Sequence, residues 1–170
     1  MTSKKITNQS DKYKNQASPR VVVIGVGNLL MRDEGIGIHA VQALQAIDLP
    51  PDVKLIDGGT SPDLIAYMRA GDKIIIIDAA KAGGEPGAIY HFKPEDILVE
   101  KQFLYSAHEL GVVENLKLME MSGHRPVEVI IIGIEMAVIG WGMELSPVLK
   151  QRLPMIVEVV LKEMGLGRTP

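Results

Sequence analysis

Two carboxylates and one imidazole in this chain, Glu34, Asp78 and His108, have the side-chain types that bind a divalent metal ion. Together they would supply oxygen and nitrogen ligands and leave coordination positions open for another molecule, as a metal site that takes part in chemistry requires. The three residues lie far apart in the sequence and match no local ligand motif of the His-Glu-x-x-His kind. A shared site would therefore depend on the fold to bring them together.

Each of these residues also has an ordinary structural explanation, and residue type alone leaves both explanations open. Asp78 and a further acid at a strand end, Asp57, could accept hydrogen bonds from the loops that follow them. Glu34 could compensate a helix dipole, and His108 could be an ordinary residue in a helix's first turn. If Asp57 has a chemical role, it is that of a general base or of a group that orients the substrate.

The elements that must position these residues begin with the segment 21–37. Val21 to Ile24 is an unbroken β-branched run with no polar face, as in a strand buried on both sides of a parallel sheet. The glycine-rich turn after it lacks the third glycine of a dinucleotide fingerprint, and the chain has no Gly-Lys-Ser/Thr of a P-loop. Asp33 stands where we expect the N-cap of the next helix, which places Glu34 near the carboxyl end of this strand.

Four further segments have the composition of strands: 53–56, 73–78, 88–92 and 127–134. The connection from residue 79 to 88 is too short and too rich in Gly and Pro for a crossover helix, so we expect 88–92 to run antiparallel. Capping residues and apolar spacing predict helices after Asp33, after Thr60 or Ser61, after Ser106 and after Ser146.

This alternation of strands and helices predicts a three-layer α/β/α domain with a five-stranded mixed sheet, four strands parallel and one antiparallel. Ligands of such folds lie off the carboxyl ends of the strands, where Glu34, Asp57 and Asp78 fall. Trp141, in the loop before the last helix, is predicted to pack into that loop. The alternative is that it lines a peptide groove.

The composition limits the classes of function. The chain has 170 residues and a formal net charge of -3, so we expect one domain over 19–170 that binds neither nucleic acid nor membrane. Residues 1–18 are polar and are expected to form a disordered tail. The absence of cysteine excludes disulfides, thiolate metal sites and cysteine nucleophiles, and suits a cytoplasmic protein. We favour a monomer.

Several motifs that occur in the same order resemble those of the hydrogenase maturation endopeptidases. They are the run from Gly25 to Gly37, Asp57-Gly58-Gly59-Thr60, Asp78 at the end of its strand, Ser106-Ala107-His108-Glu109-Leu110 and Gly142-Met143-Glu144-Leu145-Ser146-Pro147. The resemblance implies a single α/β peptidase domain over 19–170. It also implies a function, the removal of a carboxyl-terminal extension from the large-subunit precursor of a nickel-iron hydrogenase once nickel has been inserted.

By the same resemblance, Glu34, Asp78 and His108 bind nickel that the substrate supplies, and no organic cofactor is expected. The precursor brings soft cysteine thiolates, so both proteins could share one ion, which could polarise the scissile carbonyl or activate a water. Two alternatives stay open. One is a peptidase or amidase that holds zinc permanently in the same three residues, and the other is a non-enzymatic α/β module that docks an assembly intermediate.

Overall fold

The fold is a five-stranded sheet in the order β2-β1-β3-β5-β4. The computed structural model describes residues 20–60, 65–94, 96, 107–123 and 125–167, so the expected tail over 1–18 lies outside the described residues. The strands are β1 (Val21–Val26), β2 (Val53–Gly59), β3 (Lys73–Ala80), β4 (Ile89–Phe92) and β5 (Glu128–Glu135). β4 pairs antiparallel with β5, and the other pairs are parallel. The predicted mixed sheet and its antiparallel strand are confirmed.

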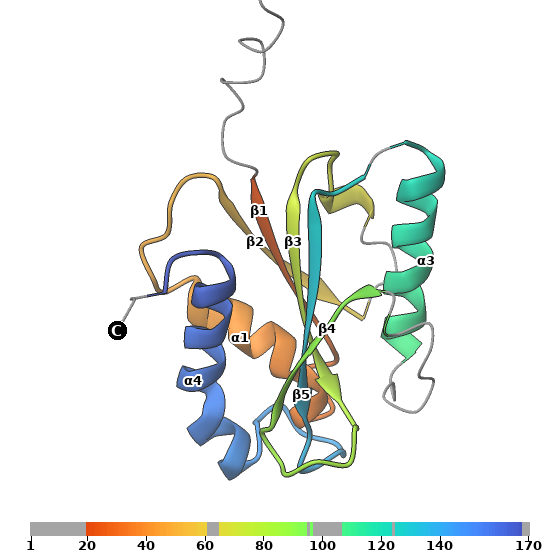
Figure 1. Cartoon of the computed structure of the whole chain (residues 1–170). Helices are drawn as coiled ribbons and strands as arrows, with labels where there is room; N and C mark the ends of the chain where they lie inside the picture. The colour runs from red at the N-terminus through yellow and green to blue at the C-terminus, as the bar shows by residue number, and fades with distance from the viewer. Residues whose placement is uncertain (1–19, 61–64, 95, 97–106, 124, 168–170) are drawn as a thin grey trace, which may run out of the picture.

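Helices cover both faces of the sheet (Figure 1). α1 (Ile36–Leu44) and α4 (Pro147–Glu163) lie on one face, and α3 (Ala107–Met121) lies on the other with the short 3-10 helix η3 (Ile65–Tyr67). In the part of the chain that the structure describes, no helix is long and apolar enough to cross a membrane. The predicted three layers are confirmed, whereas the first turn of the helix expected after Thr60 falls outside the described residues.

Successive residues of β1 pack into two different cores. Val21 and Val23 join the core beneath α1 and α4, and Val22 and Ile24 join the core that includes Met119 of α3. The strand is therefore buried on both sides, which explains why its sequence has no polar face.

Two glycines of the first motif let α1 approach the sheet closely. A Cβ atom on Gly25 would lie 2.2 Å from the carbonyl oxygen of Gly37. One on Gly37 would lie 2.2 Å from the carbonyl oxygen of Ile77 in β3. These glycines therefore serve helix–sheet packing, and they hold the start of α1 against the carboxyl ends of β1 and β3.

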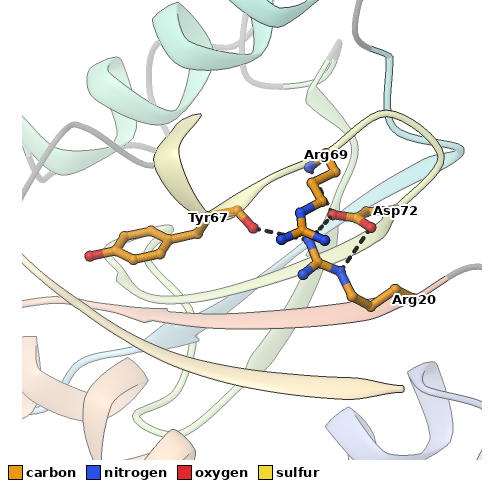
Figure 2. A network of polar contacts seen from close by, with 4 residues as sticks. All are labelled: Arg20, Tyr67, Arg69 and Asp72. Atoms are coloured by element: carbon orange, nitrogen blue, oxygen red, sulfur yellow. Dashed lines mark hydrogen bonds and ion pairs between the residues drawn. The ribbon is translucent and has the colours of Figure 1, made fainter. Parts of the chain in front are cut away.

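A partly buried ion pair joins the opposite, amino-terminal edge of the same two strands (Figure 2). Arg20 precedes β1 and donates to Asp72, which precedes β3, through Nε at 3.0 Å and Nη2 at 2.6 Å. Asp72 is 4% exposed and also accepts from the backbone N–H of Arg69 at 2.8 Å. The hydrogen bond to Asp72 raises the pKa of Arg20 further above its ordinary value, so the guanidinium stays charged.

Asp72→Ala should lower the free energy of unfolding by about 3 kcal/mol, because it leaves the Arg20 guanidinium with the Tyr67 carbonyl but no carboxylate, and the backbone N–H of Arg69 without its acceptor. Urea unfolding of both proteins measures this. Glu128→Ala is the matched control, since the carboxylate that it removes from the pair with Lys73 is 50% exposed and the loss should be at most about 1 kcal/mol. Equal losses in the two variants would contradict the structural role assigned to the partly buried pair.

Candidate functional site

The carboxyl ends of β1, β2 and β3 form the edge at which the candidate residues lie. Gly25 of β1 pairs in register with Asp57 on one side and with Ile77 on the other. Asp57 and Asp78 are therefore at nearly the same height in the sheet with β1 between them, two strand spacings of about 4.8 Å apart. Their predicted placement at strand ends is confirmed.

Asp78 is a buried carboxylate in β3, with 2% of its surface exposed. Side chains alternate between the two faces along a strand, so Asp78 lies on the same face as Ile74 and Ile76. These two residues belong to the core on the α3 side. The Oδ1 atom of Asp78 accepts a hydrogen bond from the backbone N–H of Ala79 at 2.8 Å. Asp78 therefore caps the following backbone and also places a carboxylate on the face that α3 covers.

Glu34 lies in η2 (Asp33–Gly35), a single 3-10 turn that leads into α1. Its side chain is partly buried, and η2 packs against β3, the strand that carries Asp78. The backbone of Glu34 also contacts the turn after β1, where a Cβ on Gly27 would lie 2.0 Å from the Glu34 carbonyl oxygen. The fold thus brings the Glu34 and Asp78 segments together at one edge.

His108 lies in the first turn of α3, as predicted. α3 ends close to where β5 begins, at the amino-terminal edge of the sheet, so its first turn faces the carboxyl edge (Figure 1). Among the side chains that the structure describes, no three His, Asp or Glu residues form a group that could hold a metal ion. The His108 side chain is not one of those described, so the convergence of Glu34, Asp78 and His108 stays a prediction.

Asp57 is exposed at the end of edge strand β2. Its Oδ1 accepts from the backbone N–H of Gly59 at 3.0 Å, which matches the loop-capping explanation weighed from the sequence. Asp57 shares the α1 face of the sheet with Leu55, opposite to the face of Asp78, and its exposed carboxylate is accessible to a substrate at this edge. Its role as a general base or orienting group stays a prediction.

The predicted N-cap role of Asp33 is wrong. The N-cap of α1 is Gly35, and no side chain bonds to the helix start there. Asp33 is instead 0% exposed and accepts three backbone hydrogen bonds, from Ala137 at 3.0 Å, Val138 at 2.8 Å and Ser146 at 2.7 Å. It therefore anchors the loop between β5 and α4 next to Glu34.

Sequence reasoning also missed Glu135, which ends β5. This residue is 4% exposed and accepts from the N–H groups of Ala82 and Gly83 and from the hydroxyl of Tyr90 at 3.0 Å. Burial raises the pKa of Tyr90, and the hydrogen bond to Glu135 adds to the shift. Glu135 thus holds the loop before β4. The sequence does contain a signal for Glu135, because it follows an apolar strand in the same way as Asp78 does.

Trp141 does not pack into its loop, contrary to the prediction. It is 81% exposed, in a loop that pairs with residues 30–32 at the site edge. The alternative, that Trp141 lines a peptide groove, stays a prediction.

The family model described as "hydrogenase maturation protease" matches residues 38–163, a range that contains Asp57, Asp78 and His108. The chain is 32% identical to the hydrogenase expression/formation protein HupD of Thiocapsa roseopersicina, over 88% of this chain and 70% of that protein. It is 30% identical to the hydrogenase 2 maturation protease of Escherichia coli, over 89% of this chain and 96% of that one.

Solved structures agree with the sequence comparisons. The hydrogenase maturating endopeptidase HybD from E. coli superposes with a TM-score of 0.77 at 30% identity, over 86% of this chain and 94% of that one. The [NiFe] hydrogenase maturation protease HybD from Thermococcus kodakarensis superposes with a TM-score of 0.70 at 32% identity, over 85% and 98%.

Proposed function

Because the chain belongs to the hydrogenase maturation protease family and is a peptide hydrolase, we propose that it removes the carboxyl-terminal extension of a nickel-iron hydrogenase large-subunit precursor after nickel insertion. The precursor itself supplies the nickel. The observation that carries this proposal is the buried Asp78 carboxylate, at the sheet edge where Glu34 and the first turn of α3 also lie.

The side chains offered to the metal fit an ion that the substrate carries. Glu34 and Asp78 provide carboxylate oxygens and His108 an imidazole nitrogen, a set that binds nickel less strongly than thiolates do. A precursor that holds its nickel through cysteines would therefore keep the ion while this protein completes its coordination. Cleavage would then depend on whether nickel is present, since without the ion the precursor loses this attachment.

The chemistry of hydrolysis requires a water whose oxygen bonds to the scissile carbonyl carbon while the peptide C–N bond breaks and the leaving nitrogen takes up a proton. Asp57 can accept a proton from that water or orient the peptide, because its carboxylate is exposed at the same edge. The nickel of the precursor holds the neighbouring peptide in place for this attack and can polarise its carbonyl.

The direct test is to incubate the purified protein with a nickel-loaded precursor and to follow the precursor by intact mass spectrometry. The proposal expects the loss of one carboxyl-terminal fragment and no other product. A precursor that keeps its full mass, although bound, would favour the docking module, and a cut elsewhere would contradict the assigned bond. Metal analysis of the protein alone tests the alternative of a resident-zinc peptidase or amidase, which requires about one tightly held zinc per chain.

A further inference from the structure

Five apolar side chains are exposed together at the site edge, and we call them the Trp141 patch. Their exposed fractions range from 40% for Val138 to 81% for Trp141. The members are Leu30, Val138, Ile139, Trp141 and Met143. They come from two segments that pair with each other through bridges between Met31 and Gly142 and between Arg32 and Ile139. Exposed apolar side chains gathered on two paired segments are typical of a binding site.

The patch is held rigidly beside Glu34. The N–H of Gly142 donates to the Leu30 carbonyl at 3.0 Å, and the N–H of Arg32 donates to the Gly142 carbonyl at 2.8 Å. Asp33 then fixes the same loop through its three backbone hydrogen bonds. Because Asp33 is the chain neighbour of Glu34, anything that docks on the Trp141 patch is brought next to the proposed nickel ligand.

Arg32 introduces a positive charge beside this apolar surface. It is the one residue other than glycine with a positive φ, 52°, in the part of the chain that the structure describes. Such backbone strain costs about 1–3 kcal/mol and persists where the surroundings hold the residue in a required position. The exposed side chain donates from Nε to the Trp141 carbonyl at 3.3 Å and makes no ion pair with any described residue. The outer nitrogens of the guanidinium are thus directed at solvent or at a partner.

We propose that the Trp141 patch and Arg32 dock the hydrogenase precursor, through apolar side chains of the precursor and a carboxylate that pairs with Arg32. This inference rests on the proposed function. Trp, Met and Arg are among the side chains enriched in protein interfaces, and Trp and Arg are among those enriched in hot spots. The cation beside the patch favours a partner that carries a negative charge there, since a neutral apolar partner would leave the guanidinium desolvated and unpaired.

The test uses the kinetics of precursor cleavage by the full-length protein. Trp141→Ser should raise KM by about 30-fold, the size of effect that loss of an interface hot spot produces, with kcat changed little. Met121→Ser is the matched control, because Met121 is 87% exposed at the end of α3, by the opposite sheet edge, and its KM should stay at the wild-type value. Arg32→Gln should raise KM by about 10-fold, whereas Arg32→Lys should keep most of the affinity.

The outcomes separate this inference from the proposed function. If wild type does not cleave the precursor, the proposed function fails. If wild type cleaves and Trp141→Ser has the wild-type KM, the docking surface fails while the function stands. Sedimentation equilibrium of the protein alone gives a second check. A wild-type dimer that Trp141→Ser converts to a monomer would show that the patch binds a second copy of the chain, which would overturn the proposal.

Discussion

Asp78→Asn should reduce cleavage of a nickel-loaded precursor by about 100-fold or more. Mutating a residue that only hydrogen-bonds to a metal ligand already lowers metal affinity or activity by about 10–100-fold, and Asp78 is proposed to be a ligand itself. The substitution removes the ligand charge with almost no change in volume. The amide oxygen of asparagine can still accept the hydrogen bond that Oδ1 receives from Ala79. The fold should therefore survive while the proposed attachment to nickel is lost.

His108→Ala should have the same effect on cleavage, because one lost ligand of three leaves the shared ion poorly held. Cleavage and thermal unfolding should be measured on the same preparations of both variants. The structural explanation of these residues expects normal cleavage in both variants, because neither side chain would then contact the metal. Wild-type cleavage rates in both variants would end the assignment of the metal site.

Asp33→Asn should lower the free energy of unfolding by about 3 kcal/mol. The carboxylate receives two N–H groups on one oxygen and one on the other. Either orientation of the asparagine amide turns an NH2 group toward a buried N–H, so at least one donor loses its acceptor, at about 1–3 kcal/mol each. Urea unfolding measures the loss.

The matched control is Asp48→Asn, the same substitution at an exposed acid, which should change stability by less than about 0.5 kcal/mol. Asp33→Asn should also slow precursor cleavage, since Asp33 anchors the loop that carries Trp141. A variant with wild-type stability would refute the anchoring role.

The strands and their directions could be predicted because each depends on local sequence. The apolar runs of β1 and β3 have no polar face, and the breaker-rich connection before β4 leaves no room for a crossover helix. The placement of Glu34, Asp57 and Asp78 at one edge followed from the rule that parallel strands end together.

The role of Asp33 could not be predicted from local preference. An aspartate just before a helix fits an N-cap, but its acceptor oxygens are used by N–H groups more than 100 residues further along the chain. The prediction for Trp141 was wrong for a related reason. Its exposure depends on the pairing of its loop with residues 30–32, and a pairing between such distant segments leaves no periodic pattern in the sequence. The positive φ of Arg32 could not be predicted either, because arginine rarely adopts this backbone conformation.

We expect the nickel of the precursor, held jointly by Glu34, Asp78 and His108, to license cleavage. This role is tested most directly by the initial cleavage rate of one precursor preparation before and after nickel loading, with the protease itself stripped of metal by a chelator and desalted. We expect the wild-type protein to cleave the nickel-loaded precursor and not the nickel-free precursor, and Asp78→Asn to cleave neither. Equal rates on the two forms of the precursor would contradict this role of nickel.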